Sequence, residues 1–237
     1  TCGIRMSERK PKYVSVQLLG VSELKGAPYN PRKRDSARFE LVKTSLKKLG
    51  WLLPMYVTDK GEILSGHQRF DAAKELGAQQ VPAVVLKNLD LDRRRGANIV
   101  FNRATNDMHK TDSGGALAQQ MPMTVVEEAA QGLSDVEVKS NDFFPCMRME
   151  EVDTRQLMGD NITTFLSHAI RQAESLYHWA DTSIPIVITK DNKVVNGIGR
   201  LQHASEVGIP TVQVITIDET KAEFARIMLN QLSMDFD

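Results

Sequence analysis

The sequence has few of the features that would hold a secreted or membrane protein together. Only two cysteines, Cys2 and Cys146, occur in 237 residues, which is too few for a disulfide framework or a zinc site. No apolar run approaches the length of a membrane-spanning helix, and the opening "TCGIRMSERK" lacks the apolar core of a signal peptide. We therefore expect a cytoplasmic protein with inert thiols and no contact with a membrane.

Aromatic residues are also scarce, at 6%, but hydrophobic residues make up 41% and charged residues 25% of the chain. These fractions are typical of a soluble globular protein, and the length suits one large domain or two small ones with their own cores. The five histidines do not combine with other residues into a full ligand set at metal spacing, so we predict no protein-built metal site.

A net charge of zero conceals an asymmetry between the two halves of the chain. Residues 1–118 hold 21 Lys and Arg against 12 Asp and Glu, whereas residues 119–237 hold 9 against 18. The positive half favours polyanions such as DNA, although solvated surfaces or attraction between the halves would explain the split equally well. The candidate contacts to nucleic acid are the clustered basic residues Lys33, Arg34, Arg38, Arg93, Arg94 and Arg95.

An internal repeat becomes visible when the sequence is shifted against itself until Gly66 falls on Gly197. Glycines and prolines, which punctuate the backbone, then coincide elsewhere too: Pro54 falls on Pro185 and Gly77 on Gly208. With three residues dropped from the second copy's loop, Pro82 also falls on Pro210. This order of matches predicts a duplicated structural unit.

Each copy has an α+β pattern. In the first, we predict helices at 39–50, 67–77 and 92–104, and strands at 52–58, 63–65 and around Val84. In the second, we predict a helix at 164–180 and strands at 184–189 and 193–196. The fold class is thus α+β, with two tandem units that each contain a small mixed sheet and flanking helices. The predicted domains are 12–105 and 148–237, joined by a helical linker at 106–147.

Part of that linker, "GGALAQQMPMTVVEEAAQGL" at 114–133, has a weak resemblance in pattern to a helix-turn-helix. A DNA-reading helix needs Arg or Lys on its exposed face, but Glu127 and Glu128 occupy that place. We therefore prefer a structural linker over a helix-turn-helix.

The stretch "ILSGHQRFDAAKELG", residues 63–77, carries the chemistry of the first copy. A strand that stops at Gly66 and starts a helix presents free backbone N–H groups and the positive end of the helix dipole, which together form an anion site. Arg69 has the geometry to bind phosphate oxygens, and His67 can donate a hydrogen bond or carry a proton near neutral pH. In the alternative interpretation, Gly66 is only a turn residue and the other side chains are ordinary helix surface.

Upstream of this stretch lies "PYNPR", Pro28 to Arg32, followed by a helix and a strand. The two boxes in this order resemble those of the ParB/sulfiredoxin superfamily, in which an N-P-x-Q-P-R-like box precedes a G-E-R-R-x-x-A-A-x-x-x-G box. The resemblance covers about residues 14–105, and it extends to 148–237 only through the repeat.

The resemblance implies a pocket for a nucleoside triphosphate, ATP or CTP, with a Mg²⁺ ion bridging the phosphates. Carried over to this chain, it implies that the nucleotide is bound by Asn30, Arg32, Gly66, His67, Gln68 and Arg69. Of these, His67 and Arg69 are the implied catalytic residues.

The boxes also depart from those of individual superfamily members. His67 stands where ParB commonly has Glu, which is closer to the box of free-serine kinases, but Glu23 and Asp35 lack the context of a kinase's acidic base. Sulfiredoxin has a reactive cysteine beside its His-Arg pair and this chain has none there, so we do not expect sulfinic-acid repair.

The second copy keeps Gly197 and Arg200 but has Ile198 and Gly199 in place of His67 and Gln68. It also lacks an Asn-Pro-Arg box and lies among acidic residues. We therefore expect it to be a structural partner that packs on the first copy in an intramolecular pseudo-dimer, while only the first copy carries chemistry.

Three functions compete on these observations. The first is a nucleoside-triphosphate-binding ParB-like protein that takes part in DNA transactions of a phage or mobile element and hydrolyses the nucleotide. The alternative is an NTP-dependent kinase of the free-serine-kinase type that phosphorylates a small hydroxyl or a hydroxylated base. The third is a scaffold that has lost catalysis. Turnover with and without DNA separates the three.

Overall fold

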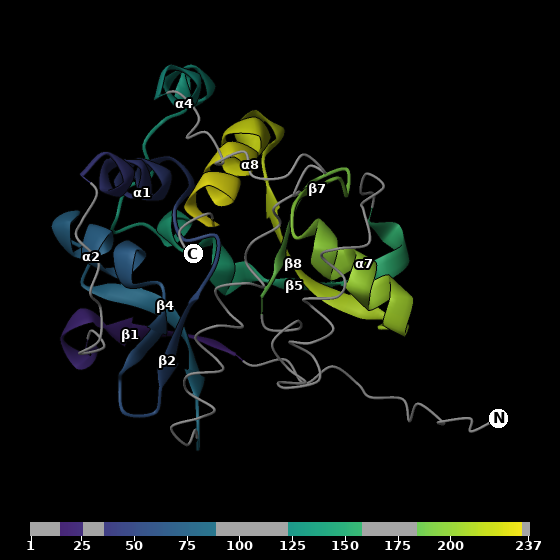
Figure 1. Ribbon diagram of the computed structural model, residues 1–237, viewed down its shortest axis with the longest axis horizontal. Coiled ribbons are helices and arrows are strands. Elements are labelled where there is room, and N and C mark those ends of the chain that lie inside the picture. Colours follow the sequence, from purple (N-terminus) through teal and green to yellow (C-terminus); the bar gives the residue numbers. More distant parts are fainter. Residues whose placement is uncertain (1–14, 26–35, 89–122, 158–183, 234–237) are drawn as a thin grey trace, which may run out of the picture.

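The computed structural model describes residues 15–25, 36–88, 123–157 and 184–233, which form two units, each with its own four-stranded mixed sheet (Figure 1). The predicted α+β fold class is confirmed. In the first unit the strand order is β1-β4-β2-β3, and in the second it is β5-β8-β6-β7. The strands are β1 (Val16–Gly20), β2 (Met55–Thr58), β3 (Ile63–Ser65), β4 (Gln80–Leu86), β5 (Glu150–Asp153), β6 (Ile186–Thr189), β7 (Val194–Asn196) and β8 (Thr211–Ile217).

The two sheets share not only their strand order but also their register. In the first sheet β2 and β4 are parallel with Met55 opposite Ala83, and in the second β6 and β8 are parallel with Ile186 opposite Val214. The shift that places Gly66 on Gly197 also places both residues of the first pair on those of the second. The strands β3 and β7 pair antiparallel to β2 and β6, each with an irregularity at the same step.

The predicted loss of three residues before the last strand is wrong. Pro82 lies inside β4 opposite Leu18, whereas Pro210 precedes β8, and its carbonyl accepts a hydrogen bond from the backbone of Thr154. The residue of β8 that corresponds to Pro82 is Gln213, opposite Glu151. Because the pairing of β4 with β2 begins only at Ala83, the missing N–H of Pro82 costs no hydrogen bond on that side.

The helices of the first unit are α1 (Ser36–Leu49) and α2 (His67–Glu75), close to their predicted positions. The apolar stripe of α1 is buried at Phe39, Val42, Leu46 and Leu49, as its spacing predicts. The chain turns at Gly50, which has a φ of +69° and where a Cβ would lie 2.7 Å from the carbonyl oxygen of Phe143. Such a φ favours glycine. The predicted helices at 92–104 and 164–180 lie outside the described residues.

The described part of the linker contains α4 (Met123–Ala130), a non-helical stretch at 131–140, and the short 3-10 turns η2 (Asn141–Phe143) and η3 (Pro145–Arg148). The backbone of the linker is hydrogen-bonded to the end of α1 and to the loop that follows α1. The backbone N–H of Trp51 donates to Phe143 over 2.8 Å, and that of Cys146 donates to Trp51 over 3.0 Å. The N–H of Val136 donates to Lys47 over 2.6 Å. The linker is therefore part of the first unit's packing.

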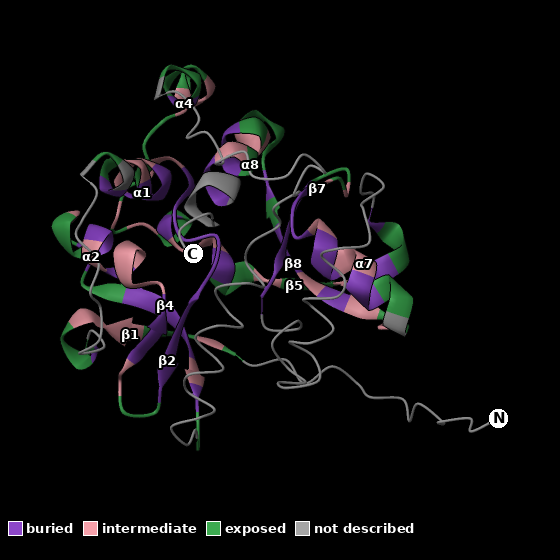
Figure 2. Ribbon diagram, in the orientation of Figure 1, coloured by how far each residue is buried: buried purple, intermediate pink, exposed green. Residues whose placement is uncertain are grey.

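The second unit adds α7 (Ile198–Val207) and α8 (Glu219–Ser233). Helix α8 lies between the two units and packs against α1, α4 and β7 (Figure 1). Its residues Phe224, Ala225 and Met228 are fully buried in a core that also contains Leu46 and Met55 of the first unit. Buried residues run from both sheets toward this helix (Figure 2). One apolar cluster thus spans both units, and a second, smaller cluster lies within the second unit alone.

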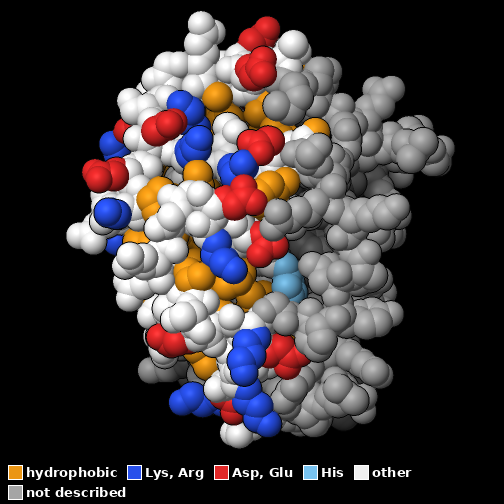
Figure 3. Space-filling view, turned by 90° about the vertical axis from the view of Figure 1, so that its left-hand side faces the viewer, with side chains coloured by type: hydrophobic (Ala, Val, Ile, Leu, Met, Phe, Trp, Pro, Cys, Tyr) orange, Lys and Arg blue, Asp and Glu red, His pale blue; other side chains and the backbone are white. Residues whose placement is uncertain are grey.

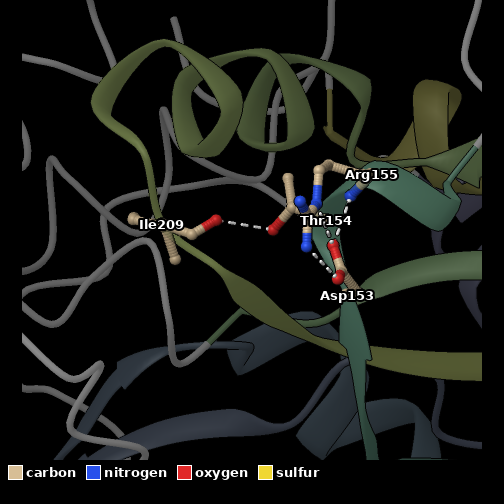
Figure 4. Close-up of polar contacts among 4 residues, drawn as sticks. All are labelled: Asp153, Thr154, Arg155 and Ile209. Carbon is tan, nitrogen blue, oxygen red and sulfur yellow. Dashed lines mark hydrogen bonds and ion pairs between the residues drawn. The ribbon is translucent and has the colours of Figure 1, made fainter.

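Each unit fixes its first strand through a 3-10 turn, η1 (Val21–Glu23) or η4 (Thr154–Gln156). The backbone N–H of Val21 donates to Gln79, as that of Thr154 does to Pro210. The second unit adds two side-chain contacts: the Thr154 hydroxyl donates to the Ile209 carbonyl over 2.7 Å, and Asp153 pairs with Arg155 (Figure 4). Strands β1 and β5 and these two turns were not predicted from the sequence. Among the described helices, none combines the length and apolar character needed to span a bilayer.

Candidate functional site

The first unit's candidate site lies where β3 ends and α2 begins. Gly66 has a φ of +100° and lies at the N-terminus of α2 without any side chain capping that end; this φ favours glycine. The carbonyl of Gly66 accepts from the N–H of Phe70 over 2.9 Å. The N–H groups of the first turn have no acceptor within the helix, and the helix dipole adds positive potential there. This end of α2 suits an anion.

The side chain of His67, the first residue of α2, is half-buried. Its Nε2 atom is buried and has no hydrogen-bond partner in the described part of the chain. Burial lowers the pKa of His67 below its ordinary value, and the carboxylates of Asp71 and Glu62 oppose that shift without reversing it, since negative charge favours the protonated ring. At neutral pH the imidazole is therefore neutral.

Arg69 lies one turn into the helix, and its guanidinium turns back toward the start of β2. Its Nη1 donates to the carbonyl oxygen of Leu53, and its Cζ lies 5.7 Å from the centre of the Trp51 ring, within the range of a cation–π contact. Burial lowers the pKa of Arg69, whereas Tyr56 and Cys146 favour its charged form. The sequence predicted that this guanidinium binds a phosphate. In the structure it donates instead to the protein's own backbone.

Three residues around that guanidinium were not predicted as neighbours of the site. Trp51 and Tyr56 are almost completely buried, and Cys146 of the linker is fully buried. Burial raises the pKa of the Cys146 thiol to about 12 and raises that of Tyr56 above its ordinary value. The only local signal for the position of Trp51 is that it directly follows the predicted helix end at Gly50.

No sequence signal indicates that Cys146 lies near Arg69, because the two residues are far apart in the sequence and are brought together only by the fold. The raised pKa agrees with the expected inertness of this thiol.

The structure brings together four predicted residues, Gly66, His67, Gln68 and Arg69, along the first turn of α2. The remaining predicted contacts lie outside the described residues: Asn30, Arg32, Lys33, Arg34, Arg93, Arg94 and Arg95. Arg38 belongs to α1, but its side chain is not described. The described first unit, residues 15–25 and 36–88, carries nine Lys and Arg against six Asp and Glu. Most of the positive excess of residues 1–118 thus lies elsewhere, and the face in Figure 3 mixes both signs.

The equivalent place in the second unit has the same backbone and a different chemistry. Gly197 has a φ of +101° and again starts a helix without a side-chain cap. Arg200 is buried, and its Nη2 donates to the Pro185 carbonyl over 3.3 Å and to Oδ1 of Asn196 over 3.1 Å. The two positions between them hold Ile198 and Gly199, so only backbone N–H groups remain for an anion.

Within the described residues, no group of three or more His, Cys, Asp or Glu is arranged to hold a metal ion. The two carboxylates whose charge is felt at His67, those of Asp71 and Glu62, are too few for a protein-built cage. They suit at most a Mg²⁺ ion that keeps its waters and arrives with phosphates.

Comparisons with known proteins agree on the first unit. The model of the ParB N-terminal domain matches residues 5–101. The "ParB-like nuclease domain-containing protein YnaK" of Escherichia coli K12 is 32% identical over 75 residues, which cover 32% of this chain and 86% of YnaK. A "Nucleoid occlusion protein" of Bacillus thuringiensis (strain Al Hakam) is 35% identical over 86 residues, but the match covers 34% of this chain and only 29% of that protein.

Among solved structures, the C-terminally truncated chromosome-partitioning protein ParB from Caulobacter crescentus, complexed with CTP-gamma-S, is 20% identical. The alignment covers 70% of this chain and 90% of that one, with a TM-score of 0.34. Because a TM-score this low supports no argument, the assignment of the chain to a family rests on the family model and on YnaK.

Proposed function

The chain belongs to the ParB N-terminal domain family, and from this premise we propose that its first unit binds a nucleoside triphosphate, CTP or ATP, for work on DNA. The observation that carries the proposal is the uncapped start of α2 at Gly66, beside the unpartnered Nε2 of His67. Phosphate groups match both features, because they accept from helix N-termini and from imidazole.

In this proposal the phosphates lie on the backbone N–H groups of His67, Gln68 and Arg69, and the glycine at position 66 lets them approach. The side chains of His67 and Gln68 add hydrogen bonds, and Asn30 and Arg32 of the first box supply the other side of the pocket. A Mg²⁺ ion bridges the phosphates rather than occupying a protein cage. The bound nucleotide is hydrolysed slowly, and His67, beside the phosphates, is the group that can orient or deprotonate the attacking water.

The DNA part of the proposal rests on charge. The clusters at 32–34, 38 and 93–95 are basic, and the first half of the chain attracts phosphates as a whole. Binding dominated by phosphate contacts falls steeply with salt, with a slope of about −0.9 per phosphate neutralised on a log–log plot. Substituting Arg93, Arg94 and Arg95 by Gln should make the slope less negative, so that DNA binding depends less on salt. The same change at Lys190, Lys193 and Lys221 of the second unit is the matched control and should leave it unchanged.

The test of nucleotide binding uses the second unit as a template. The double substitution His67→Ile and Gln68→Gly copies the residues that the second unit has on the same backbone, so it should fold. Isothermal titration with CTP, ATP and GTP, each with Mg²⁺, should show binding to the wild type that falls by at least about tenfold in this variant, since two hydrogen-bonding side chains are lost. Equal affinities would refute the placement of the phosphates.

Hydrolysis is measured separately, as phosphate release with and without duplex DNA. Release stimulated by DNA is the expected result. Release that requires a small hydroxyl acceptor instead of water would identify a phosphotransferase, and a complete lack of both binding and release would identify a scaffold.

A further inference from the structure

We propose that Arg69 is a positioning residue: its side chain shapes the phosphate-binding turn by holding Gly66 and α2 against β2, and the guanidinium does not itself contact the phosphates. The inference deepens the proposed function, on which its ligand part rests. It is carried by a similar juxtaposition in both units: an arginine one turn into a helix donates back to a backbone carbonyl just before a parallel strand. The acceptor is Leu53, two residues before β2, in the first unit and Pro185, directly before β6, in the second.

In the first unit the guanidinium has one backbone acceptor and one ring contact within the protein. Nη1 donates to Leu53, and the Trp51 ring lies 5.7 Å from Cζ. Nη2 lies close enough to Gly66 that a Cβ there would be 3.4 Å away, and the same Cβ would be 3.0 Å from Cγ of Met55. If Nη1 were instead to reach a phosphate beyond the helix start, it would have to give up the Leu53 carbonyl and leave that buried acceptor unsatisfied, which is costly.

In the second unit the same arginine is packed still more tightly. Arg200 donates to both Pro185 and Asn196 and is only 2% exposed. A Cβ on Gly197 would lie 2.6 Å from its Nη2. Here the arginine fills the space behind the turn, with its charge turned away from solvent.

The pattern of what the two units share then separates two roles. Both keep the glycine at positive φ and the arginine, which together define the turn. Only the first unit has polar side chains at the two positions between them, His67 and Gln68, where the second has Ile198 and Gly199. Residues that the packing requires are present in both units, and residues that a ligand would require are present in one. Arg69 belongs with the first group.

The positioning role has a consequence for specificity. If Arg69 only holds the turn, its loss loosens the backbone donors that face the phosphate nearest α2, so every nucleotide that uses those donors weakens by the same factor. If it contacted the outer phosphates directly, the loss would grow with each added phosphate. The phosphate dependence of the effect therefore distinguishes holding from contact.

The experiment compares Arg69→Met, which keeps an apolar stem and removes the donors, with Arg200→Met. Affinities for CMP, CDP and CTP, and for the adenine series, are measured by titration well below the melting temperature. Emission of Trp51 in a Trp179→Phe background reports on the guanidinium above its ring. We expect Arg69→Met to lower Tm, to change the Trp51 emission and to weaken all members of a series by a common factor of about ten. Arg200→Met should lower Tm and leave the affinities unchanged.

Arg69→Lys keeps the charge but cannot cover the ring and the carbonyl together, so it covers the case in which Arg69→Met does not fold. Under the positioning role it still weakens mono-, di- and triphosphates by one common factor. An unchanged Tm with a loss that rises from CMP to CTP would overturn the inference. If the wild type bound no nucleotide at all, the proposed function would fail, and Tm and Trp51 emission would still decide whether Arg69 holds the turn.

Discussion

The first and second units have the same strand order, the same register and the same glycine–arginine turn, yet they differ in charge and in the two side chains at that turn. Gly66 and Gly197 have almost identical φ values, +100° and +101°. The polar pair His67 and Gln68 is replaced by Ile198 and Gly199. A glycine–arginine turn shared by two units can therefore serve the fold in both places, and the proposed nucleotide contacts are the side chains that differ between them.

The largest expected effect concerns the core that joins the units. Phe224 of α8 is fully buried in the cluster that includes residues of both sheets. Phe224→Ala should therefore lower the free energy of unfolding by about 4 kcal/mol, from lost burial and the cavity left behind. Because the core is shared, Trp51 of the first unit should report the lowered midpoint even though the substitution lies in the second.

That result is checked by chemical denaturation followed both by Trp51 emission, in the Trp179→Phe background, and by circular dichroism. One coincident transition supports a pseudo-dimer that unfolds as a whole. A Trp51 transition that keeps its wild-type midpoint while the circular dichroism transition moves would show that the units fold independently.

The next effect compares the two glycines at the turns with a third whose surroundings are open. In Gly197→Ala the new Cβ meets Arg200 at 2.6 Å and the Ile186 Cα at 3.1 Å, in addition to the unfavourable φ. Strain of both kinds should cost about 3 kcal/mol. In Gly66→Ala the nearest contact is at 3.0 Å. This milder crowding should cost about 2 kcal/mol.

The control is Gly208→Ala, where φ is +73° and nothing lies within 4 Å of the added Cβ. It should cost only the conformational term of about 1 kcal/mol. Thermal unfolding of the three variants gives the order. If Gly66→Ala and Gly208→Ala were equal, the close packing of Arg69 and Met55 against Gly66 would contribute nothing.

Much of this comparison was predictable from the sequence, because its signals are local. The strand at 63–65, the helix start after Gly66 and the helix end near Gly77 follow from apolar pattern and backbone punctuation, and the structure has them there. The offset between the two copies was also visible. The error arose from treating Pro82 and Pro210 as equivalent punctuation: one lies within a strand, at a position whose N–H is not needed toward β2, and the other lies in a turn.

The site could be predicted only in part, since its remaining contacts are long-range. Nothing near Arg69 in the sequence indicates that its long side chain reaches Leu53, or that Cys146 of the linker lies beside it. The edge strands β1 and β5 escaped prediction because they are partly exposed and lack the short apolar run that marks the buried β3 and β7. The packing of α8 on α1 depends on surfaces of two units that no local pattern relates.

A smaller effect should distinguish the units by pH. The pKa of His67 is lowered in the folded protein, so the unfolded state binds its proton first as the pH falls. Above pH 6.5, the ordinary histidine value, His67 has no effect on the free energy of unfolding. Below it, His67 lowers the free energy of unfolding progressively as the pH falls. In His67→Gln that contribution disappears, so below about pH 6.5 its free energy of unfolding should fall less steeply than the wild type's.

A bound triphosphate should reverse the shift, because negative charge beside the imidazole favours its proton despite the burial. Titrations in two buffers of different ionisation enthalpy should then show proton uptake on binding near pH 6.5 in the wild type. Uptake that persists unchanged in His67→Gln would assign the proton to another group.

The smallest expected effect concerns charge attraction between parts of the chain. An ion pair joins α1 of the first unit to the linker, where Nζ of Lys48 lies 2.9 Å from Oδ1 of Asp135. The Asp135 side chain is 63% exposed. Asp135→Asn should therefore cost about 0.5 kcal/mol at low salt and less at about 1 M NaCl, where screening shortens the range of the interaction.

The direction of this effect with pH follows from the same contact. Lys48 lowers the pKa of Asp135 below 3.8, so the contribution is present above that value and disappears as the pH falls through the folded-state pKa. Lys190→Met, which removes an exposed pair with Asp218 inside the second unit, is the control and should have an equally small effect. If raising salt from low to molar concentration lowered the wild type's stability as much as Phe224→Ala does, charge attraction and not the apolar core around α8 would hold the units together.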